Sequence, residues 1–336
     1  MDPKKRTLAG VAATMLLVIL TACGGEYPQS TLHPTADFGS EIDRLFRTIV
    51  WWALGVFVVV ETALIVAIIK FRDRPGAPAP KHVHGSTLLE ISWTLAPAII
   101  LIFIAVPTIR TIFRTDAAPP ENAMQVEVIG HQWWWEFRYP ELGIVTANEM
   151  RVPAGQPVTL VMTSDDVIHS FWAPKLGGKR DVMPGRSTRI TFTPDSVGVF
   201  FGQCAEFCGV SHANMRMRVV VEDSSGFAGW VTQERTAPAA EETLSSEEAA
   251  GLAVFRTKGC MACHAIEGMA AGVLGPNLSH VGSRTTIAAG ILPNTAEGLA
   301  RWIRNPAGEK PGSLMPQMPM TEEELAALVA YLQSLN

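Results

Sequence analysis

The sequence predicts a multidomain membrane protein with a two-helix transmembrane hairpin, an all-β sandwich and a separate C-terminal domain. Two long apolar runs near the N-terminus are each long enough to cross a membrane as a helix. A stretch of alternating apolar and polar residues follows them, and a shift in composition precedes the C-terminal part. At 336 residues, of which 48% are hydrophobic and 18% charged, the chain is long enough for more than one domain.

The N-terminal segment has the profile of a secretory signal. Three basic residues within the first six precede an apolar run over residues 8–20, and small residues follow. The tetrapeptide LTAC, which ends at Cys23, is similar to a bacterial lipobox, in which the cysteine is lipidated and becomes the first mature residue. We therefore expect residues 1–22 to be a lipoprotein-type signal peptide and residues 23–47 to be an extracytoplasmic segment. An uncleaved signal anchor, or an ordinary signal peptide with an incidental cysteine, stays open.

Residues 48–110 are expected to form two transmembrane helices. The apolar runs at 48–69 and 91–109 each contain at most one ionisable residue, which makes the buried hairpin of a soluble protein a poor alternative. The loop at 70–87 carries several basic residues, so the positive-inside rule places it in the cytoplasm. Everything after Arg110 is then outside. This predicts a multi-pass protein of the bacterial inner membrane with its cysteine chemistry in the periplasm.

Residues 122–222 alternate with the period of two that half-buried strands show. Turn sequences at 153–156 and 184–185 separate the alternating stretches, so we expect an all-β sandwich whose end loops can hold ligands. The alternating positions are Met124, Val126, Val128; Val158, Leu160, Met162; Thr188, Ile190, Phe192; and Met215, Met217, Val219, Val221.

The strongest local motif, CAEFCGVSHANM, supplies two thiols, an imidazole and a thioether at Cys204, Cys208, His212 and Met215. A further histidine, His169, lies upstream in DVIHSFWAP. Soft sulfur together with imidazole selects copper. A mononuclear blue-copper site uses one cysteine, so the second cysteine here suggests two copper ions bridged by two thiolates. Such a pair would share one unpaired electron, which spreads the bond-length change on reduction and favours fast electron transfer.

Two alternatives use the same cysteines. A disulfide between Cys204 and Cys208 explains neither His212 nor Met215. A tetrahedral zinc site would use the two cysteines and two histidines but would leave Met215 without a role. The whole set of donor atoms therefore favours copper over either alternative.

With these motifs, the sequence resembles subunit II of the haem-copper cytochrome c oxidases. The resemblance covers both apolar runs and the β segment, and it depends on LLEISWTLAPAIILIFIAVP, GHQWWWEF, DVMPGR and the cysteine motif. It implies a cupredoxin fold that holds the binuclear copper centre called CuA, with no departure at a ligand position. The ligands that it implies are His169, Cys204, Cys208, His212, Met215 and the backbone carbonyl of Glu206.

The same resemblance implies roles for three further side chains. Trp133 matches the exposed tryptophan through which electrons enter from cytochrome c, with a core aromatic as the alternative. The Glu206 carboxylate matches a ligand of a magnesium or manganese ion at the junction with subunit I. Glu90 matches a carboxylate at the mouth of a proton channel in subunit I, although a carboxylate at the end of a membrane helix can simply be solvated.

A second redox domain is expected at residues 245–336, after a linker at 223–244 that is rich in Ser, Ala, Pro, Glu and Thr. The motif CMACH is the attachment pattern of a c-type haem. Cys260 and Cys263 would bind the two vinyl groups, and His264 would be the proximal iron ligand. A thioredoxin-like redox pair is disfavoured by that histidine and by the absence of a βαβ pattern.

This domain resembles cytochrome c throughout, which implies an all-α fold with GPNL in the haem-loop position. A terminal helix is expected from Thr321, with Thr321 and Glu324 as its capping pair. Met315 is the expected axial ligand because KPGSLMP resembles the ligand loop of that family, with Met318 and Met320 as competitors. The apolar face of the terminal helix contains Leu325, Leu328, Val329 and Leu332.

The two resemblances together imply subunit II of a bacterial cytochrome c oxidase, a respiratory translocase, with a fused cytochrome c domain. Electrons would pass from an external cytochrome c to the haem, then to CuA and then to subunit I, where oxygen is reduced. Subunit III is a further expected partner. The formal net charge of -5 is small and evenly spread, whereas nucleic-acid binding would need a basic stripe, so no nucleic-acid partner is expected.

Three other classes of protein share part of this pattern. A nitrous-oxide reductase would need a further histidine-rich catalytic domain, and the chain has only 8 histidines. A copper-delivery protein would need an exchangeable site, which a full ligand set beside a covalent haem disfavours. A quinol oxidase subunit II would lack the cysteines at positions 204 and 208.

Overall fold

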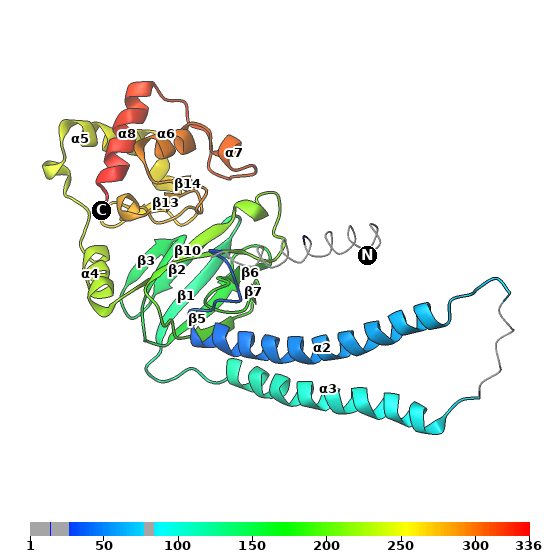
Figure 1. Ribbon diagram of the computed structural model, residues 1–336. Coiled ribbons are helices and arrows are strands. Elements are labelled where there is room, and N and C mark those ends of the chain that lie inside the picture. Colours follow the sequence, from blue (N-terminus) through cyan, green and yellow to red (C-terminus); the bar gives the residue numbers. More distant parts are fainter. Residues whose placement is uncertain (1–13, 15–26, 77–83) are drawn as a thin grey trace.

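The computed structural model describes Thr14, residues 27–76 and residues 84–336. Apart from Thr14, the predicted signal peptide lies outside the described residues, as does Cys23. Figure 1 shows a long pair of helices that extends from a sheet-rich domain, with a mostly helical domain on the other side of the sheets. The layout is the transmembrane hairpin, all-β sandwich and helical domain that the sequence predicts, although the helical domain also contains two short two-stranded sheets.

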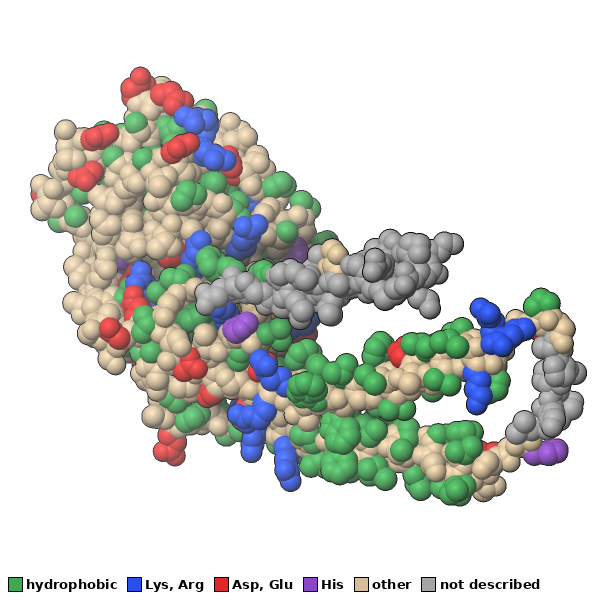
Figure 2. Space-filling model, viewed as in Figure 1, with side chains coloured by type: hydrophobic (Ala, Val, Ile, Leu, Met, Phe, Trp, Pro, Cys, Tyr) green, Lys and Arg blue, Asp and Glu red, His purple; other side chains and the backbone are tan. Residues whose placement is uncertain are grey.

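The hairpin consists of α2 (Asp37–Lys70) and α3 (Thr87–Thr115), and both helices are long and apolar enough to cross a membrane. Apolar side chains cover both helices along most of their length, and basic side chains lie near the two ends (Figure 2). Trp52 of α2 stacks on Phe103 of α3, with ring centroids 5.5 Å apart. So large an exposed apolar surface fits a lipid environment better than water.

The first turn of α2 belongs to the sandwich, which explains why this helix begins before the apolar run at residue 48. Ala36 pairs with Pro194 as an isolated bridge, and the backbone N–H of Thr193 donates to Asp37 Oδ1 at 2.7 Å. Phe38 packs in the core of the sandwich. The hairpin is therefore joined to the sandwich by packing and hydrogen bonds as well as by the chain.

The sandwich has two five-stranded sheets. The first has the order β3-β2-β1-β5-β8, and it consists of β1 (Met124–His131), β2 (Trp134–Tyr139), β3 (Ile144–Ala147), β5 (Val158–Ser164) and β8 (Thr188–Phe192). The second has the order β4-β10-β9-β6-β7, and it consists of β4 (Glu149–Pro153), β6 (His169–Trp172), β7 (Arg180–Val182), β9 (Gly198–Cys204) and β10 (Arg216–Glu222).

The core between the sheets follows the predicted alternation. Val126 and Val128 of β1 are fully buried, as are Leu160 and Met162 of β5, which pairs with β1 in parallel. Gln125, between two buried neighbours, is exposed. Burial of each large apolar side chain stabilises the fold by roughly 2 kcal/mol, so this pattern fixes which strand face points inward. The predicted strands at these positions are confirmed.

The segment expected as a linker at 223–244 is partly a helix. α4 (Ser224–Glu234) begins after the N-cap Asp223, whose side chain accepts a hydrogen bond from the backbone N–H of Gly226 at 2.8 Å. Trp230 is buried and packs edge-on against Tyr139 of β2, with centroids 5.2 Å apart. The linker interpretation is wrong for α4, because Trp230, Phe227 and Val231 pack against the core of the sandwich and anchor this stretch.

The C-terminal domain, hereafter the haem domain, is built on α5 (Ser246–Thr257) and α8 (Glu322–Ser334). Each helix begins with a capping box, formed by Ser245 and Glu248 in α5 and by Thr321 and Glu324 in α8, as predicted for α8. The four predicted apolar positions of α8 are all buried. The remaining elements are α6 (Ala296–Arg304), α7 (Pro306–Glu309), β11 (Ala265–Ile266), β12 (Ala270–Ala271), β13 (Thr286–Ile287) and β14 (Leu292–Pro293).

The two long helices of the haem domain cross at a glycine. A Cβ atom on Gly251 of α5 would lie 2.0 Å from the carbonyl oxygen of Ala327 and 2.6 Å from Cβ of Tyr331, both in α8. Real side chains do not approach so closely, so only glycine lets the two backbones meet here. This contact fixes the scaffold on which the haem-attachment segment lies.

Candidate copper centre and haem site

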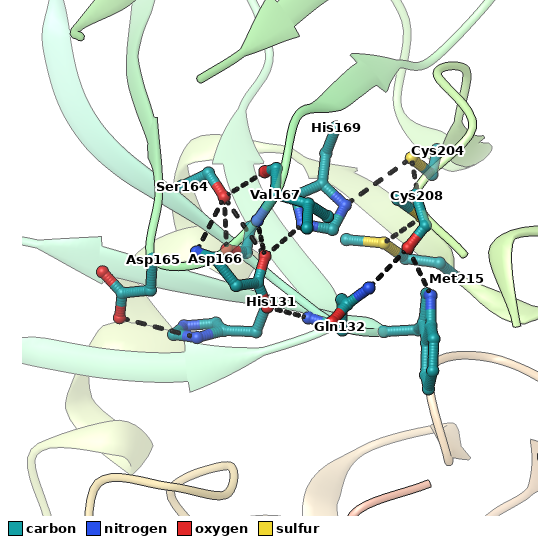
Figure 3. Close-up of polar contacts among 12 residues, drawn as sticks. His131, Gln132, Ser164, Asp165, Asp166, Val167, His169, Cys204, Cys208 and Met215 are labelled. Atoms are coloured by element: carbon teal, nitrogen blue, oxygen red, sulfur yellow. Dashed lines mark hydrogen bonds and ion pairs between the residues drawn. The ribbon is translucent and has the colours of Figure 1, made fainter. Parts of the chain in front are cut away.

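The strand ends of the second sheet gather the donor atoms of the copper motif. His169 opens β6, Cys204 closes β9, and Met215 directly precedes β10. Cys208 and His212 lie in the connection between β9 and β10, which we call the copper loop (residues 204–215). Because β6, β9 and β10 are neighbours in the sheet, all these side chains meet at one end of the sandwich. Figure 3 shows His169, Cys204, Cys208 and Met215 together there.

The donor atoms lie close together around Cys208. Its Sγ atom is 3.7 Å from Cys204 Sγ, 3.6 Å from His212 Nδ1 and 3.8 Å from Met215 Sδ. Cys204 Sγ is 3.9 Å from His169 Nδ1. A disulfide would bring the sulfurs to about 2.05 Å, so the two cysteines are free and the disulfide alternative does not describe this structure. The buried group of His169, Cys204 and Cys208 can hold a metal ion.

Hydrogen bonds among these groups change how easily the thiols lose their protons. The bond from Cys208 lowers the pKa of Cys204 to about 3, against the opposing effect of burial. The same bond raises the pKa of Cys208, because its proton is shared with the neighbouring thiolate. The shared bond therefore makes one thiol of the pair easier to ionise and the other harder. Thiolates are the form that binds metal, so metal binding would release thiol protons from this pair.

A carboxylate fixes the orientation of His169. Asp166 Oδ1 lies 2.8 Å from His169 Nε2, which leaves Nδ1 facing the sulfurs (Figure 3). Burial acts to lower the pKa of His169, but the hydrogen bonds with Asp166 and Cys204 raise it. Gly130 makes room for the ring, because a Cβ there would lie 2.8 Å from His169 Cδ2. Asp166 was not predicted from the sequence, although a carboxylate three residues before His169 could have suggested such a partner.

Trp133 and its neighbour hold the backbone of the copper loop. Trp133 Nε1 donates to the carbonyl oxygen of Cys208 at 3.0 Å, and Gln132 Nε2 donates to the same oxygen at 2.7 Å. The resemblance implies an exposed tryptophan here, but Trp133 is only 8% exposed. That expectation is wrong because Lys310 and Gly312 of the haem domain cover the residue.

The two carboxylates with roles implied by the family resemblance, Glu206 and Glu90, lie apart from each other. The carbonyl oxygen of Glu206 is 3.2 Å from Cys204 Sγ, and its residue is exposed to solvent. Glu90 is exposed in the first turn of α3, at the end of the hairpin remote from the sandwich (Figure 1). The structure therefore brings the Glu206 backbone, but not Glu90, to the copper ligands.

The haem-attachment motif lies in a tight turn after α5. Cys260 begins the 3-10 turn Cys260–Ala262 and Cys263 follows it directly, and His264 Nδ1 donates to the carbonyl oxygen of Pro276 at 2.8 Å. This bond leaves Nε2 as the nitrogen that can bind iron. Burial lowers the pKa of His264, which favours the neutral ring that binds metal. A Cβ on Gly275 would lie 2.6 Å from His264 Cε1, so glycine is required beside the ring.

Three methionines precede α8, and two of them reach the apolar core of the haem domain. Met315 and Met320 are partly buried and pack against that core, whereas Met318 is not part of the cluster. The turn, the free thiols and the oriented histidine fit a covalently attached haem. The thiolate, imidazole and thioether groups of the copper loop likewise fit a binuclear copper centre.

The fold and its two sets of ligands define a membrane-anchored electron-transfer protein with a cupredoxin-like domain and a cytochrome c domain. Residues 32–111 match the family "Cytochrome C oxidase subunit II, transmembrane domain". Residues 142–223 match "Cytochrome C oxidase subunit II, periplasmic domain", and residues 248–336 match "Cytochrome c".

Relatives match nearly the whole chain. Cytochrome c oxidase subunit 2 of Alkalihalophilus pseudofirmus is 38% identical over 331 residues, which is 96% of this chain and 95% of that protein. Cytochrome c oxidase subunit 2 of Bacillus sp. strain PS3 is 36% identical over 96% of this chain and 95% of its own length. Quinol oxidase subunit 2 of Bacillus cereus is 30% identical over 71% of this chain and 84% of that protein.

The chain belongs to the cytochrome c oxidase subunit II family. It is a membrane protein with a periplasmic domain and a cytochrome c domain, and it is part of a haem-copper oxidase complex with subunit I as a partner. The periplasmic domain implies a CuA centre and the cytochrome c domain implies haem c. The predicted family, fold class and enzyme class are thereby confirmed.

Proposed function

We propose that this chain receives electrons from an external cytochrome c at its haem domain and delivers them through its copper domain to subunit I. The observation that carries the proposal is the convergence of two thiols, two imidazoles and a thioether around Cys208, in the same chain as a CxxCH turn. The copper domain is assigned to residues 122–234, the linker to 235–244 and the haem domain to 245–336. With the copper centre and the haem bound, the chain would transfer one electron at a time with little change in bond lengths at the copper centre.

The ligand roles follow from the donor atoms already described. Asp166 would keep His169 Nδ1 directed at the copper pair, and Pro276 would keep His264 Nε2 directed at the iron. Gln132 and Trp133 would hold the carbonyl of Cys208 and limit movement of the copper loop. The proposed copper ligands are His169, Cys204, Glu206 through its carbonyl, Cys208, His212 and Met215, and the proposed haem ligands are Cys260, Cys263, His264 and Met315.

Spectra of the purified full chain test this proposal. The optical spectrum should show a low-spin c-type haem. The paramagnetic spectrum should show copper hyperfine structure from one electron shared by two nuclei. A spectrum of mononuclear copper, or zinc in place of copper, would contradict the binuclear assignment.

Met315→Ala is expected to leave the haem covalently attached but to remove the bond between iron and sulfur. Attachment depends on the two cysteines, whereas axial ligation depends on the thioether, so the two properties should separate. The reduction potential should fall, and the thioether charge-transfer band should disappear from the optical spectrum. Met318→Ala is the matched control and should keep the band. The reverse result would transfer the axial role to Met318.

Glu206→Gln is expected to keep the CuA spectrum and to weaken binding of magnesium or manganese at the junction with subunit I. The carbonyl that faces Cys204 Sγ does not depend on the side chain, but a hard divalent ion prefers an anionic oxygen. The measurement is the manganese signal of the intact oxidase grown with manganese. An unchanged signal in the variant would remove this role from Glu206.

The placement in the membrane is part of the same proposal. The chain would be a multi-pass protein of the bacterial inner membrane, with basic residues such as Arg72 and Arg74 at the cytoplasmic end and both redox domains in the periplasm. Residues 1–22 would be a lipoprotein signal peptide that leaves Cys23 lipidated. Subunit III and a soluble or membrane-bound cytochrome c would be further partners, and Glu90 would lie at the entrance of a proton channel of the translocase.

A further inference from the structure

The haem domain contacts the copper loop through three consecutive residues, Lys310, Pro311 and Gly312, which we call the docking loop. Lys310 Nζ donates to the carbonyl oxygen of Trp133 and, at 3.3 Å, to that of Ala288. The hydroxyl of Ser211, in the copper loop, donates to the carbonyl oxygen of Pro311. The docking loop therefore bonds to both the tryptophan and the loop that carries the copper ligands.

Gly312 brings the docking loop into direct contact with the indole of Trp133. A Cβ on Gly312 would lie 2.7 Å from Trp133 Cη2 and 2.9 Å from Trp133 Cζ3. The residue also has a φ of +82°, which favours glycine. Met315, the proposed axial ligand, follows three residues later. The segment that carries the proposed iron ligand therefore contacts the same indole that donates a hydrogen bond to the carbonyl of Cys208.

A second contact holds the same two domains together some distance from the docking loop in sequence. The carboxylate of Glu149 at the start of β4 is buried and accepts hydrogen bonds from the backbone N–H groups and hydroxyls of Thr285 and Thr286. Arg218 Nη1 donates to Thr286 Oγ1. The haem domain is thus held at two separate contacts, one at the docking loop and one at Glu149. Either contact restrains rotation of the domain about the other.

The burial of Lys310 is costly, which indicates a specific role. The residue is 4% exposed, and burial lowers its pKa to about 7. In the described part of the chain, the partners of its amine are two backbone carbonyls and no carboxylate. An apolar side chain would avoid the desolvation cost of a buried amine but would leave both carbonyls without a donor. What the lysine provides is directional bonding across the domain boundary.

We propose that Lys310 is a positioning residue for electron transfer, because it holds the docking loop on Trp133 so that the haem domain faces the copper loop in one geometry. This inference rests on the proposed function. The step that it positions is a one-electron exchange, in which ferrous haem iron becomes ferric and the oxidised copper pair gains that electron. It also closes Trp133 to an external donor, which must therefore meet the haem domain on another face.

The test measures electron transfer inside the full chain with both centres loaded. The haem is reduced by a light flash with a photoreductant, and its reoxidation by the copper centre is followed optically. Lys310→Met should slow reoxidation by up to about tenfold, because the docking loop is released from Trp133 while the Glu149 contact stays, and a hydrogen bond of this kind is worth at most roughly that factor. Lys258→Met is the control. Lys258 Nζ also donates to a backbone carbonyl, that of Pro319, and it pairs with Glu324 at 2.9 Å; both partners lie within the haem domain, so the rate should be kept.

Gly312→Ala tests the same contact without changing a charge. The added methyl group would push the docking loop away from the indole and should slow reoxidation in the same way. Gly268→Ala is its control, because Gly268 has a φ of +72° but no atom within 4 Å of the added Cβ. Both glycine variants carry similar backbone strain, so a difference between them reports the contact with Trp133.

The possible results distinguish failure of the positioning role of Lys310 from failure of the proposed function. A missing haem or CuA spectrum in the unaltered chain would contradict the proposed function and the inference together. With both spectra present, an unchanged rate in Lys310→Met would overturn the positioning role alone. A slower rate with shifted reduction potentials of either centre would also overturn it, because driving force would then explain the change. If Lys310→Met loses either spectrum, the rate in Gly312→Ala decides.

Discussion

Cys208→Ser is expected to abolish the binuclear copper centre and to leave the haem spectrum unchanged. Cys208 Sγ is the hub of the cluster, within 3.8 Å of a donor atom of Cys204, His212 and Met215. A serine hydroxyl stays protonated near neutral pH and is a hard donor, so it does not replace a bridging thiolate on copper. Loss of an outer residue already weakens a metal site by about 10- to 100-fold, and loss of the central ligand should exceed that.

Copper analysis and the paramagnetic spectrum of the full chain measure this result. The shared-electron hyperfine pattern should be lost, with copper either absent or mononuclear. Met217→Leu is the control, because Met217 is as deeply buried as Met215 but belongs to the core of β10 rather than to the sulfur cluster. A volume-conserving change of this kind costs less than about 1.5 kcal/mol. A binuclear spectrum retained by Cys208→Ser would refute the proposed ligand set.

Gly251→Ala is expected to destabilise the haem domain by about 3 kcal/mol, because overpacking forces backbone shifts. The added methyl group would lie 2.0 Å from the carbonyl oxygen of Ala327, and a backbone atom cannot rotate away as a flexible side chain can. The helices α5 and α8 would have to separate, and their shared core would open. Denaturant unfolding followed by helical circular dichroism and by the axial methionine band measures the effect.

The control for this prediction is Gly229→Ala. Gly229 is also a helical glycine, in α4, but a Cβ there would meet nothing within 4 Å. Alanine has the higher helix propensity by about 1 kcal/mol, so this change should leave stability unchanged or raise it. Equal effects of the two substitutions would show that the crossing of α5 and α8 does not depend on glycine at position 251.

Features that depend on residues close together in the chain were predictable from the sequence. The capping pair of Thr321 and Glu324 is three residues apart, and the strand alternation at Val126 and Val128 needs no distant partner. The copper ligands were found because five of them share a segment of twelve residues, from Cys204 to Met215. Motif spacing and hydrophobic period thus predict the helix caps, the buried strand faces and the candidate metal ligands.

Features that depend on contacts between distant segments were not predictable in this way. The short α4 has no long apolar run, and its place in the fold depends on Phe227, Trp230 and Val231 packing against the sandwich, where Trp230 meets Tyr139 of β2. The burial of Trp133 depends on Lys310, which is 177 residues away along the chain. A pattern in the sequence does not show which segments far apart along the chain come into contact. Packing and desolvation of the two surfaces decide that.

The first turn of α2 has a consequence for how the copper centre is presented to subunit I. Since Asp37 and Phe38 belong to the sandwich, the sheets stand directly on the membrane helices without a flexible stalk. The height of the copper ligands above the lipid surface is then a fixed dimension of the molecule. Electron delivery to subunit I needs no diffusional search by a tethered domain, and its rate should not depend on solvent viscosity.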